Sequence, residues 1–174
     1  MKIKQSLFAI GLGMLASNVC LAEHRFSIET SNAGYEDPQF DADPNALLFG
    51  YEYSISEHFS LSAKYGDGEV DGVFQTPIGS AEMEMEYMYG VYAKGYLYPD
   101  AKFKPYATLG YTKTKLTASA GQQVFGQSED GFGYGIGVEY SVNDTMDLSL
   151  SYNQLIDKSE VELKSVNIGI GFSF

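Results

Sequence analysis

The chain of 174 residues carries a formal charge of −12 at pH 7, and its mean hydropathy is slightly polar. This acidity argues against nucleic acid as a partner, because binding to phosphate requires a basic surface. Aromatic residues make up 14% of the chain, which has 19 glycines and only 5 prolines. This composition favours strands and tight turns over disorder.

The first residues have the layout of a secretory signal peptide. Lys2 and Lys4 give a positive start, an apolar run follows over residues 7–15, and Ala22 ends a small-residue cleavage site. The apolar run is too short for a membrane-spanning helix, which needs about 20 residues. We therefore expect cleavage after Ala22 and a mature domain over residues 23–174.

The single cysteine offers a second interpretation of this segment. Cleavage immediately before Cys20 would produce a lipoprotein, but such signals usually have a small residue before the cysteine, and the chain has Val19. We favour cleavage after Ala22, which leaves a mature chain without cysteine or disulfide.

In the rest of the chain, apolar and polar residues alternate with period two, which is typical of strands with one apolar face. The pattern is clearest where Phe132 and Ile136 share one face and Gly133, Gly135 and Gly137 share the other. These glycines leave room for a large side chain from a facing strand. The alternation predicts eight strands, at residues 25–31, 46–54, 59–66, 83–98, 103–116, 130–141, 146–153 and 164–174.

The longest predicted strand, 83–98, places Met85 and Tyr89 outward and Glu86, Met88 and Lys94 inward. Inward Met88 departs from a simple polar face, which is acceptable because a narrow barrel must fill its interior with side chains.

The connections between the strands alternate in length. Short turns are expected at 55–58, 99–102 and 142–145, long loops at 32–45, 67–81 and 117–129, and a moderate loop at 154–159. With an even strand count, both termini lie at the same end as the short turns. This arrangement predicts an all-β fold, an eight-stranded antiparallel up-and-down transmembrane β-barrel, because only a closed sheet leaves no edge facing lipid. A soluble lipocalin-like barrel, with its apolar face inside, is the alternative fold.

The last strand ends the chain on an aromatic residue, which is favourable at a lipid–water boundary. Its outward face carries Phe172 and Phe174, and its other face carries Asn167 and Gly169. This spacing resembles the closing-strand signal of bacterial outer-membrane barrels, which the barrel-assembly machinery reads.

The signal peptide, the eight alternating segments, the stretch 105–111 and the Phe-terminated last strand together resemble the small outer-membrane β-barrel family. That family includes opacity-type proteins and the barrel domains of OmpA-like and OmpX-like proteins. The resemblance implies a location in the outer membrane, contact with its lipid and lipopolysaccharide, assembly by the barrel machinery, and a monomer.

Several charged residues have inward parity on different strands: Glu52, Lys64, Lys94, Glu139 and Asp147, with Glu29 as a further candidate. One interpretation is a gated ion path. We favour a salt-bridged plug, because the interior of an eight-stranded barrel is just wide enough for side chains, and buried charges need partners.

The predicted outer loops and the strand ends beside them are acidic, through Glu36, Asp37, Asp41, Asp43, Asp67, Glu69, Asp71, Glu82, Glu84, Glu86, Asp157, Glu160 and Glu162. One interpretation is that these oxygen-rich clusters bind divalent cations, shared with lipopolysaccharide phosphates. We favour a solvated acidic surface and predict no metal site and no cofactor.

Outward aromatic residues form two expected membrane girdles rather than a ligand platform. One comprises Tyr53, Phe59, Phe103, Tyr140, Phe172 and Phe174, and the other Tyr65, Tyr87, Tyr111 and Tyr152.

Catalysis is not expected, because neither His24 nor His58 is placed on a strand beside an outer-facing serine. We therefore predict a non-enzymatic integral outer-membrane protein with a structural or surface-interaction role through acidic loops. A narrow ion-conducting channel is the first alternative, and a lipid-directed enzyme is a remote one.

Overall fold

The computed structural model describes residues 24–37, 40–42, 45–69, 72–76, 79–120, 123–158 and 161–174. The predicted signal peptide and Cys20 lie outside these residues. The strands are β1 (His24–Asp37), β2 (Phe40–Ala42), β3 (Asn45–Ser54), β4 (Phe59–Glu69), β5 (Gly72–Thr76), β6 (Gly79–Tyr96), β7 (Phe103–Ala120), β8 (Gln123–Ser141), β9 (Met146–Lys158) and β10 (Val161–Ser173). The described part of the chain holds no helix that is long and apolar enough to cross a membrane.

Eight of these strands form a closed antiparallel barrel, as the alternation predicted. The order around the wall is β10, β9, β8, β7, β6, β4, β3, β1, and pairing of β1 with β10 closes the ring. That last pairing runs from Arg25↔Ser173 to Glu36↔Glu162. The two short strands stand outside the ring, since β2 pairs with β1 and β5 pairs with β6.

The apolar face of the barrel points outward. Ile136 is 66% exposed and Ile168 is 62% exposed, whereas Glu139 and Ser165 on the opposite parity are only 3% and 2% exposed. The outward surface is therefore suited to lipid and the interior is polar over much of its length. The lipocalin-like alternative, which requires the apolar face inside, is wrong.

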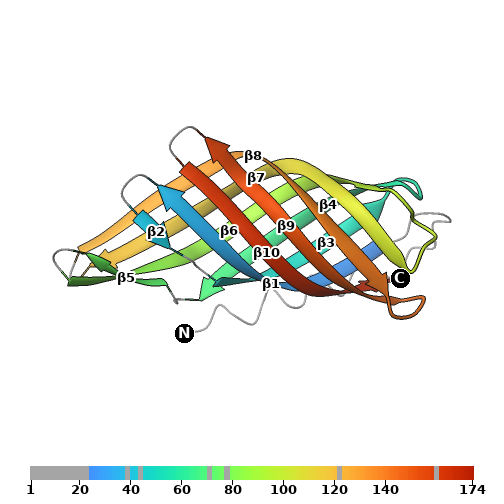
Figure 1. Cartoon of the computed structure of the whole chain (residues 1–174), viewed down its shortest axis with the longest axis horizontal. Coiled ribbons are helices and arrows are strands. Elements are labelled where there is room, and N and C mark those ends of the chain that lie inside the picture. Colours follow the sequence, from blue (N-terminus) through green and yellow to red (C-terminus); the bar gives the residue numbers. More distant parts are fainter. Residues whose placement is uncertain are drawn as a thin grey trace, which may run out of the picture.

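The two ends of the barrel differ in their connections (Figure 1). At one end lie the short turns 55–58, 97–102 and 142–145 together with His24 and Phe174, and we call this the turn end. At the other end lie β2, β5 and the hairpin of β7 and β8, and we call this the hairpin end.

Most of the residues predicted as long loops are strands. The ladder between β7 and β8 continues to Ala120↔Gln123, so the predicted loop 117–129 is largely a hairpin. Similarly, β1 reaches Asp37, and the end of β4, β5 and the start of β6 together occupy most of the predicted loop 67–81. The prediction missed these strands because a backbone ladder does not require an apolar alternation in the sequence.

The hairpin end carries a sheet that extends past the barrel wall. Pairing of β8 with β9 stops at Tyr134↔Gln154, while β8 remains paired with β7 for a further stretch. The outer parts of β6, β7 and β8, joined by β5, form what we call the projecting sheet.

The predicted parity of β6 is wrong at Met85 and Glu86, because the strand contains a bulge there. The register with β7 shifts between Met85 and Tyr87, and an extra residue in one strand reverses the alternation beyond it. Met85, predicted outward, is buried, and Glu86, predicted inward, is exposed. The bulge therefore adds an apolar side chain to the lumen.

Replacing Ile136 with Arg places a charge on the lipid-facing wall and should lower the free energy of unfolding by about 2–4 kcal/mol if the residue lies near the bilayer midplane. Folded fractions at increasing denaturant, measured in lipid vesicles by heat-modifiable gel mobility, give the stability. Ser128→Arg, on the projecting sheet, is the control and should have little effect. Equal tolerance at both positions would contradict the assignment of the lipid-facing surface.

Candidate functional site

Five charged side chains meet inside the barrel near its turn end. They come from five different strands and each is less than one-tenth exposed: Arg25 on β1, Glu52 on β3, Lys94 on β6, Glu139 on β8 and Asp147 on β9. We call this set the lumen network. Inward parity on each strand brings them together, because alternate residues of a barrel strand face its interior.

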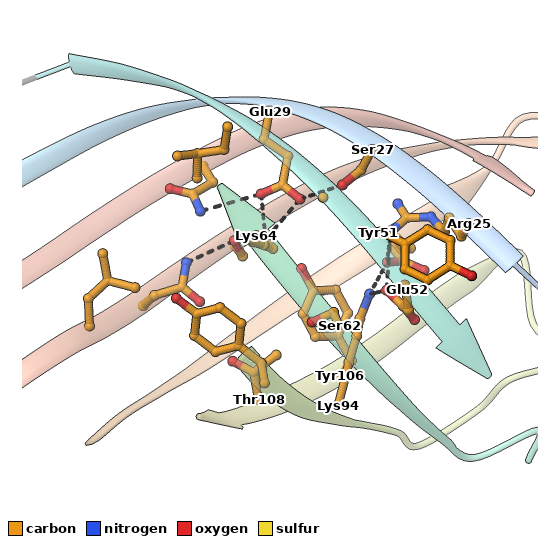
Figure 2. Close-up of a pocket in the computed structure, with 18 of the residues that line it drawn as sticks. Arg25, Ser27, Glu29, Tyr51, Glu52, Ser62, Lys64, Lys94, Tyr106 and Thr108 are labelled. Atoms are coloured by element: carbon orange, nitrogen blue, oxygen red, sulfur yellow. Dashed lines mark hydrogen bonds and ion pairs between the residues drawn. The ribbon is translucent and has the colours of Figure 1, made fainter. Parts of the chain in front are cut away.

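Ion pairs link all members of the lumen network. Lys94 Nζ lies 3.0 Å from Glu52 Oε2 and also contacts Glu139 Oε1. The Arg25 Nη1 atom lies 3.4 Å from Glu52 Oε2 and 3.2 Å from Glu139 Oε1. Arg25 also binds Asp147 in a bidentate manner, with Nε 2.9 Å from Oδ2 and Nη2 against Oδ1. Figure 2 shows Arg25, Glu52 and Lys94 directed toward one another.

Neutral side chains complete the coordination of these charges. The Tyr96 hydroxyl lies 2.8 Å from Glu52 Oε1 and 3.0 Å from Glu139 Oε2. Ser60 Oγ donates to Glu52 at 2.6 Å, and the Lys94 ammonium lies 4.2 Å from the centre of the Tyr106 ring. Burial of charge in a narrow lumen is tolerable only with such pairing, because an unpaired ion loses its hydration without compensation.

Lys64, predicted as part of the same set, belongs to a separate ion pair. Its Nζ atom lies 2.8 Å and 2.6 Å from the two carboxylate oxygens of Glu29. Ser27 Oγ donates to Glu29 Oε1 at 3.2 Å, and Asn167 Nδ2 donates to Glu29 Oε2 at 3.4 Å. Glu29, the further candidate from the sequence, is thus the partner of Lys64.

Arg25 was missed by the sequence reasoning, although it makes contacts with all three carboxylates of the lumen network. A signal was available, since Arg25 shares its parity with Ser27 and Glu29 on β1. Gly171 on β10 makes room for it, because a Cβ atom at that position would collide with the guanidinium. A side chain at Gly171 would therefore require the Arg25 guanidinium to shift.

Toward the hairpin end, the lumen becomes apolar. Along β3, the inward residues pass from Glu52 through Gly50 to Leu48 and Ala46, and Leu48 is only 1% exposed. A buried cluster fills this part of the barrel, and we call it the apolar plug: Ala33, Ala46, Leu48, Met85, Met88, Leu116, Leu155, Ile156 and Leu163. The sequence reasoning did not predict this cluster, because two of its members depend on irregular register in β6 and β9.

A very small cavity lies inside the described part of the barrel. A cavity of about 20 Å³ lies among lumen residues that include Glu29, Lys64, Lys94 and Asn167 (Figure 2). That volume holds about one water molecule. The buried Asn167 Oδ1 atom has no hydrogen-bond partner among the described residues, and a water there would satisfy it. The lumen is therefore filled by side chains rather than open.

Large rings lie over the inward glycines. A Cβ atom at Gly137 would meet the ring of Tyr106, and one at Gly110 would meet the ring of Tyr92. The glycines of β8 were expected to accommodate a side chain from a facing strand. Tyr106 instead comes from the neighbouring strand β7, where it is the register partner of Gly137.

Three residues of the predicted assembly signal lie on β10, and Phe174 follows its last residue. Phe172 and Phe174 point outward and are 45% and 56% exposed, whereas Asn167 and Gly169 face inward. The backbone of Phe174 exchanges two hydrogen bonds with His24, at 2.9 Å and 3.2 Å, and the two rings stack at 5.9 Å. The last residue thus completes the closure between β1 and β10. Recognition of this pattern by the assembly machinery stays a prediction.

The acidic residues and the two histidines form no metal or catalytic site within the described residues. Of the acidic set, only Asp67, Glu86 and Glu162 have described side chains, and no described cluster has the composition to hold a metal ion. His24 Nδ1 lies 2.7 Å from the hydroxyl of Tyr51, and His58 lies in the exposed turn 55–58.

The two predicted aromatic girdles lie on the outward surface. At the turn end, Phe59 and Phe103 are each 62% exposed, and on the side toward the hairpin end Tyr65 and Tyr152 are each 50% exposed. These positions are consistent with rings at two membrane interfaces.

A closed barrel with an apolar exterior, aromatic rows and a filled lumen defines the class of small outer-membrane barrels. The family described as "Outer membrane protein beta-barrel domain" matches residues 8–174. The chain belongs to this family, and the protein is therefore one of the outer membrane.

Solved structures of similar fold come from several bacteria. Ail, the attachment invasion locus protein of Yersinia pestis, is 16% identical with a TM-score of 0.66, over 88% of this chain and 99% of Ail. Neisserial surface protein A is 16% identical with a TM-score of 0.64, over 87% and 97%. The N-terminal barrel domain of Pseudomonas aeruginosa OprF is 15% identical with a TM-score of 0.55, over 85% and 97%. Among curated proteins, a sequence comparison finds no match.

Replacing Lys94 with Met removes the ammonium shared by Glu52 and Glu139. We expect the free energy of unfolding to fall by about 3–5 kcal/mol, because two buried carboxylates lose a partner. Denaturant titration with heat-modifiable gel mobility measures it. Lys115→Met, which breaks the exposed pair with Glu86, is the control and should change stability little. Similar small effects at both sites would contradict the structural role of the lumen network.

Replacing Phe174 with Ala tests the assembly signal separately from barrel closure, because the backbone hydrogen bonds to His24 remain. If the terminal ring is read during assembly, the substitution should reduce folded barrel in the outer membrane of expressing cells but leave refolding of purified protein into vesicles nearly unchanged. Both yields are measured by heat-modifiable mobility. Unchanged yield in cells would overturn the prediction, and an equal loss in both settings would assign Phe174 to closure alone.

Proposed function

We propose that this protein is a non-conducting, non-enzymatic barrel of the outer membrane that acts through surfaces at its hairpin end. The observation that carries the proposal is the filled lumen, in which the lumen network and the apolar plug lie one above the other. A barrel whose interior is occupied offers its external surfaces for function.

The alternative of a narrow ion channel is disfavoured by the apolar plug. An ion that passed the lumen network would still have to cross a region lined by Leu48, Met88 and Leu163, each at most 1% exposed. Transfer of an ion into an apolar region is very costly, because its hydration is lost without replacement. Opening of the ion pairs alone would therefore not create a conducting path.

Short turns usually face the periplasm and longer connections face outward in barrels of this class. We therefore place the hairpin end at the cell exterior. The projecting sheet would then stand above the membrane, where it is braced by contacts such as Lys115 Nζ to Glu86 Oε2 at 2.6 Å. That hydrogen bond lowers the pKa of the Glu86 carboxyl. The two charged side chains thus tie β6 to β7 in water.

The projecting sheet has an edge that suits contact with other chains. Within the described residues, β8 pairs with β9 only from Tyr134 to Ser141, so its outer part has a strand partner on one side alone. Unpaired backbone groups along such an edge can bind an extended segment of another protein.

The net negative charge of the chain limits the partners that its exposed surfaces can bind. Ail of Yersinia pestis has been solved in complex with the heparin analogue sucrose octasulfate. A formal charge of −12 makes a comparable polyanion an unfavourable partner for this chain and favours a neutral or basic surface. Lipopolysaccharide remains a proposed neighbour, with divalent cations between the two acidic surfaces.

An enzymatic role receives little support from the two histidines. His24 forms a hydrogen bond with Tyr51 on the outer surface of the barrel at its turn end, and His58 lies in a short turn at the same end. On the proposed orientation, this end faces away from the cell surface. Neither residue is part of a described nucleophile–base pair. A lipid-directed enzyme is therefore not proposed.

Single-channel recording in planar bilayers tests the closed lumen. We expect the refolded protein to be silent, and Lys94→Ala to be silent as well, because the apolar plug remains. Openings should appear only when Lys94→Ala is combined with Leu48→Ala and Met88→Ala. Each variant must first show the gel mobility of a folded barrel. Discrete openings of the wild type that Lys94→Ala alters would overturn the proposal and favour the channel.

A further inference from the structure

The aromatic row nearest the hairpin end is interrupted. Five neighbouring strands each carry an aromatic residue on the outward face, on the side toward the hairpin end. These residues are Tyr65 on β4, Tyr89 on β6, Tyr111 on β7, Phe132 on β8 and Tyr152 on β9. On β3 the register partner of Tyr65 is Phe49, and beyond Phe49, toward the hairpin end, the outward residues of β3, β1 and β10 are not aromatic. There Thr30 pairs with Leu47 and Ile168, and Asn32 pairs with Asn45 and Val166.

A groove occupies this gap. Its volume is about 440 Å³, and its outward lining residues are Thr30, Asn32, Asn45, Leu47, Val166 and Ile168. The volume falls within the range of roughly 300–1,000 Å³ that is usual for small-molecule sites. The groove lies on the hairpin-end side of Phe49, where three neighbouring strands carry no outward aromatic residue.

The groove lies where the outward surface changes from apolar to polar. On the turn-end side it continues into the pair Ile28↔Ile170, and on the other side it meets the pair Gly34↔Lys164. This transition marks the boundary between the hydrocarbon and the headgroup region in an outer-membrane barrel. The groove is thus continuous with the surface that contacts lipid.

The polar part of the groove is uncharged. Asn32 Nδ2 donates to Asn45 Oδ1 at 2.9 Å, which uses one donor and one acceptor of the two amide groups. Lys164, at the margin, is paired with Glu162 at 2.5 Å. This chemistry suits the carbonyl and hydroxyl groups at the junction of an acyl chain and a headgroup, rather than a phosphate.

We propose that the groove binds one membrane lipid, with an acyl chain along Leu47, Val166 and Ile168 and its ester or amide junction at Asn32 and Asn45. Lipid is the occupant because the groove opens onto the lipid-contacting surface. The site rests on the membrane location of the family and is independent of whether the lumen conducts ions.

Native mass spectrometry tests this site on the full barrel after reconstitution with phosphatidylethanolamine, phosphatidylglycerol and lipid A, the acylated part of lipopolysaccharide, and extraction into mild detergent. Two variants address different parts of the groove. Asn32→Leu with Asn45→Leu removes the amides at nearly constant size, and Thr30→Phe fills the hollow. Ala63→Phe, on the outward face of β4, is the matched control. All four proteins are first compared for folded gel mobility.

We expect the wild type and Ala63→Phe to retain one lipid, and each groove variant to retain it at least fivefold less at the same activation energy. Three results would overturn the proposal: no lipid retained by the wild type, equal retention by the folded groove variants, or retention only at high added lipid concentration. A cross-linked dimer that both groove variants abolish would assign the groove to a second copy instead.

Discussion

The structure depends on one electrostatic constraint, which is that charges enclosed by a narrow barrel must be paired with one another. Lys94 and Arg25 each contact two or more carboxylates, and these carboxylates come from three other strands. The pairs form only when the strands are closed in the observed register, since a slip by one residue would turn each inward charge toward lipid. The lumen network therefore links the order of the strands to the stability of the barrel.

The apolar plug gives the interior a second layer with a different physical basis. Leu48, Met88 and Ile156 need no hydrogen-bond partners and fill the lumen by packing alone. Together, the two layers leave room for about one water molecule in the cavity between the ion pairs. The consequence is a rigid scaffold whose variable surfaces lie outside, at the projecting sheet and at the groove in the aromatic row.

The sequence was sufficient for features that depend on strict alternation. Glu52, Lys94, Glu139 and Asp147 could be placed in the lumen because each has clear inward parity, and the closed barrel followed from the eight apolar faces. Three features depended on information that alternation does not contain. Arg25 stood at the first position of its predicted strand, the bulge at Met85 reversed parity locally, and the strand ends beyond the barrel wall carry no strict apolar alternation in the sequence.

A double-mutant cycle between Lys94 and Glu139 would test the central claim most directly. Stability in lipid vesicles would be measured for the wild type, Lys94→Met, Glu139→Gln and the double variant. Paired buried charges predict a coupling free energy of about 1–3 kcal/mol, because each single variant leaves a partner uncompensated and the double variant does not. Additive effects of the two substitutions would contradict the account and would mean that the lumen charges are stabilised independently of one another.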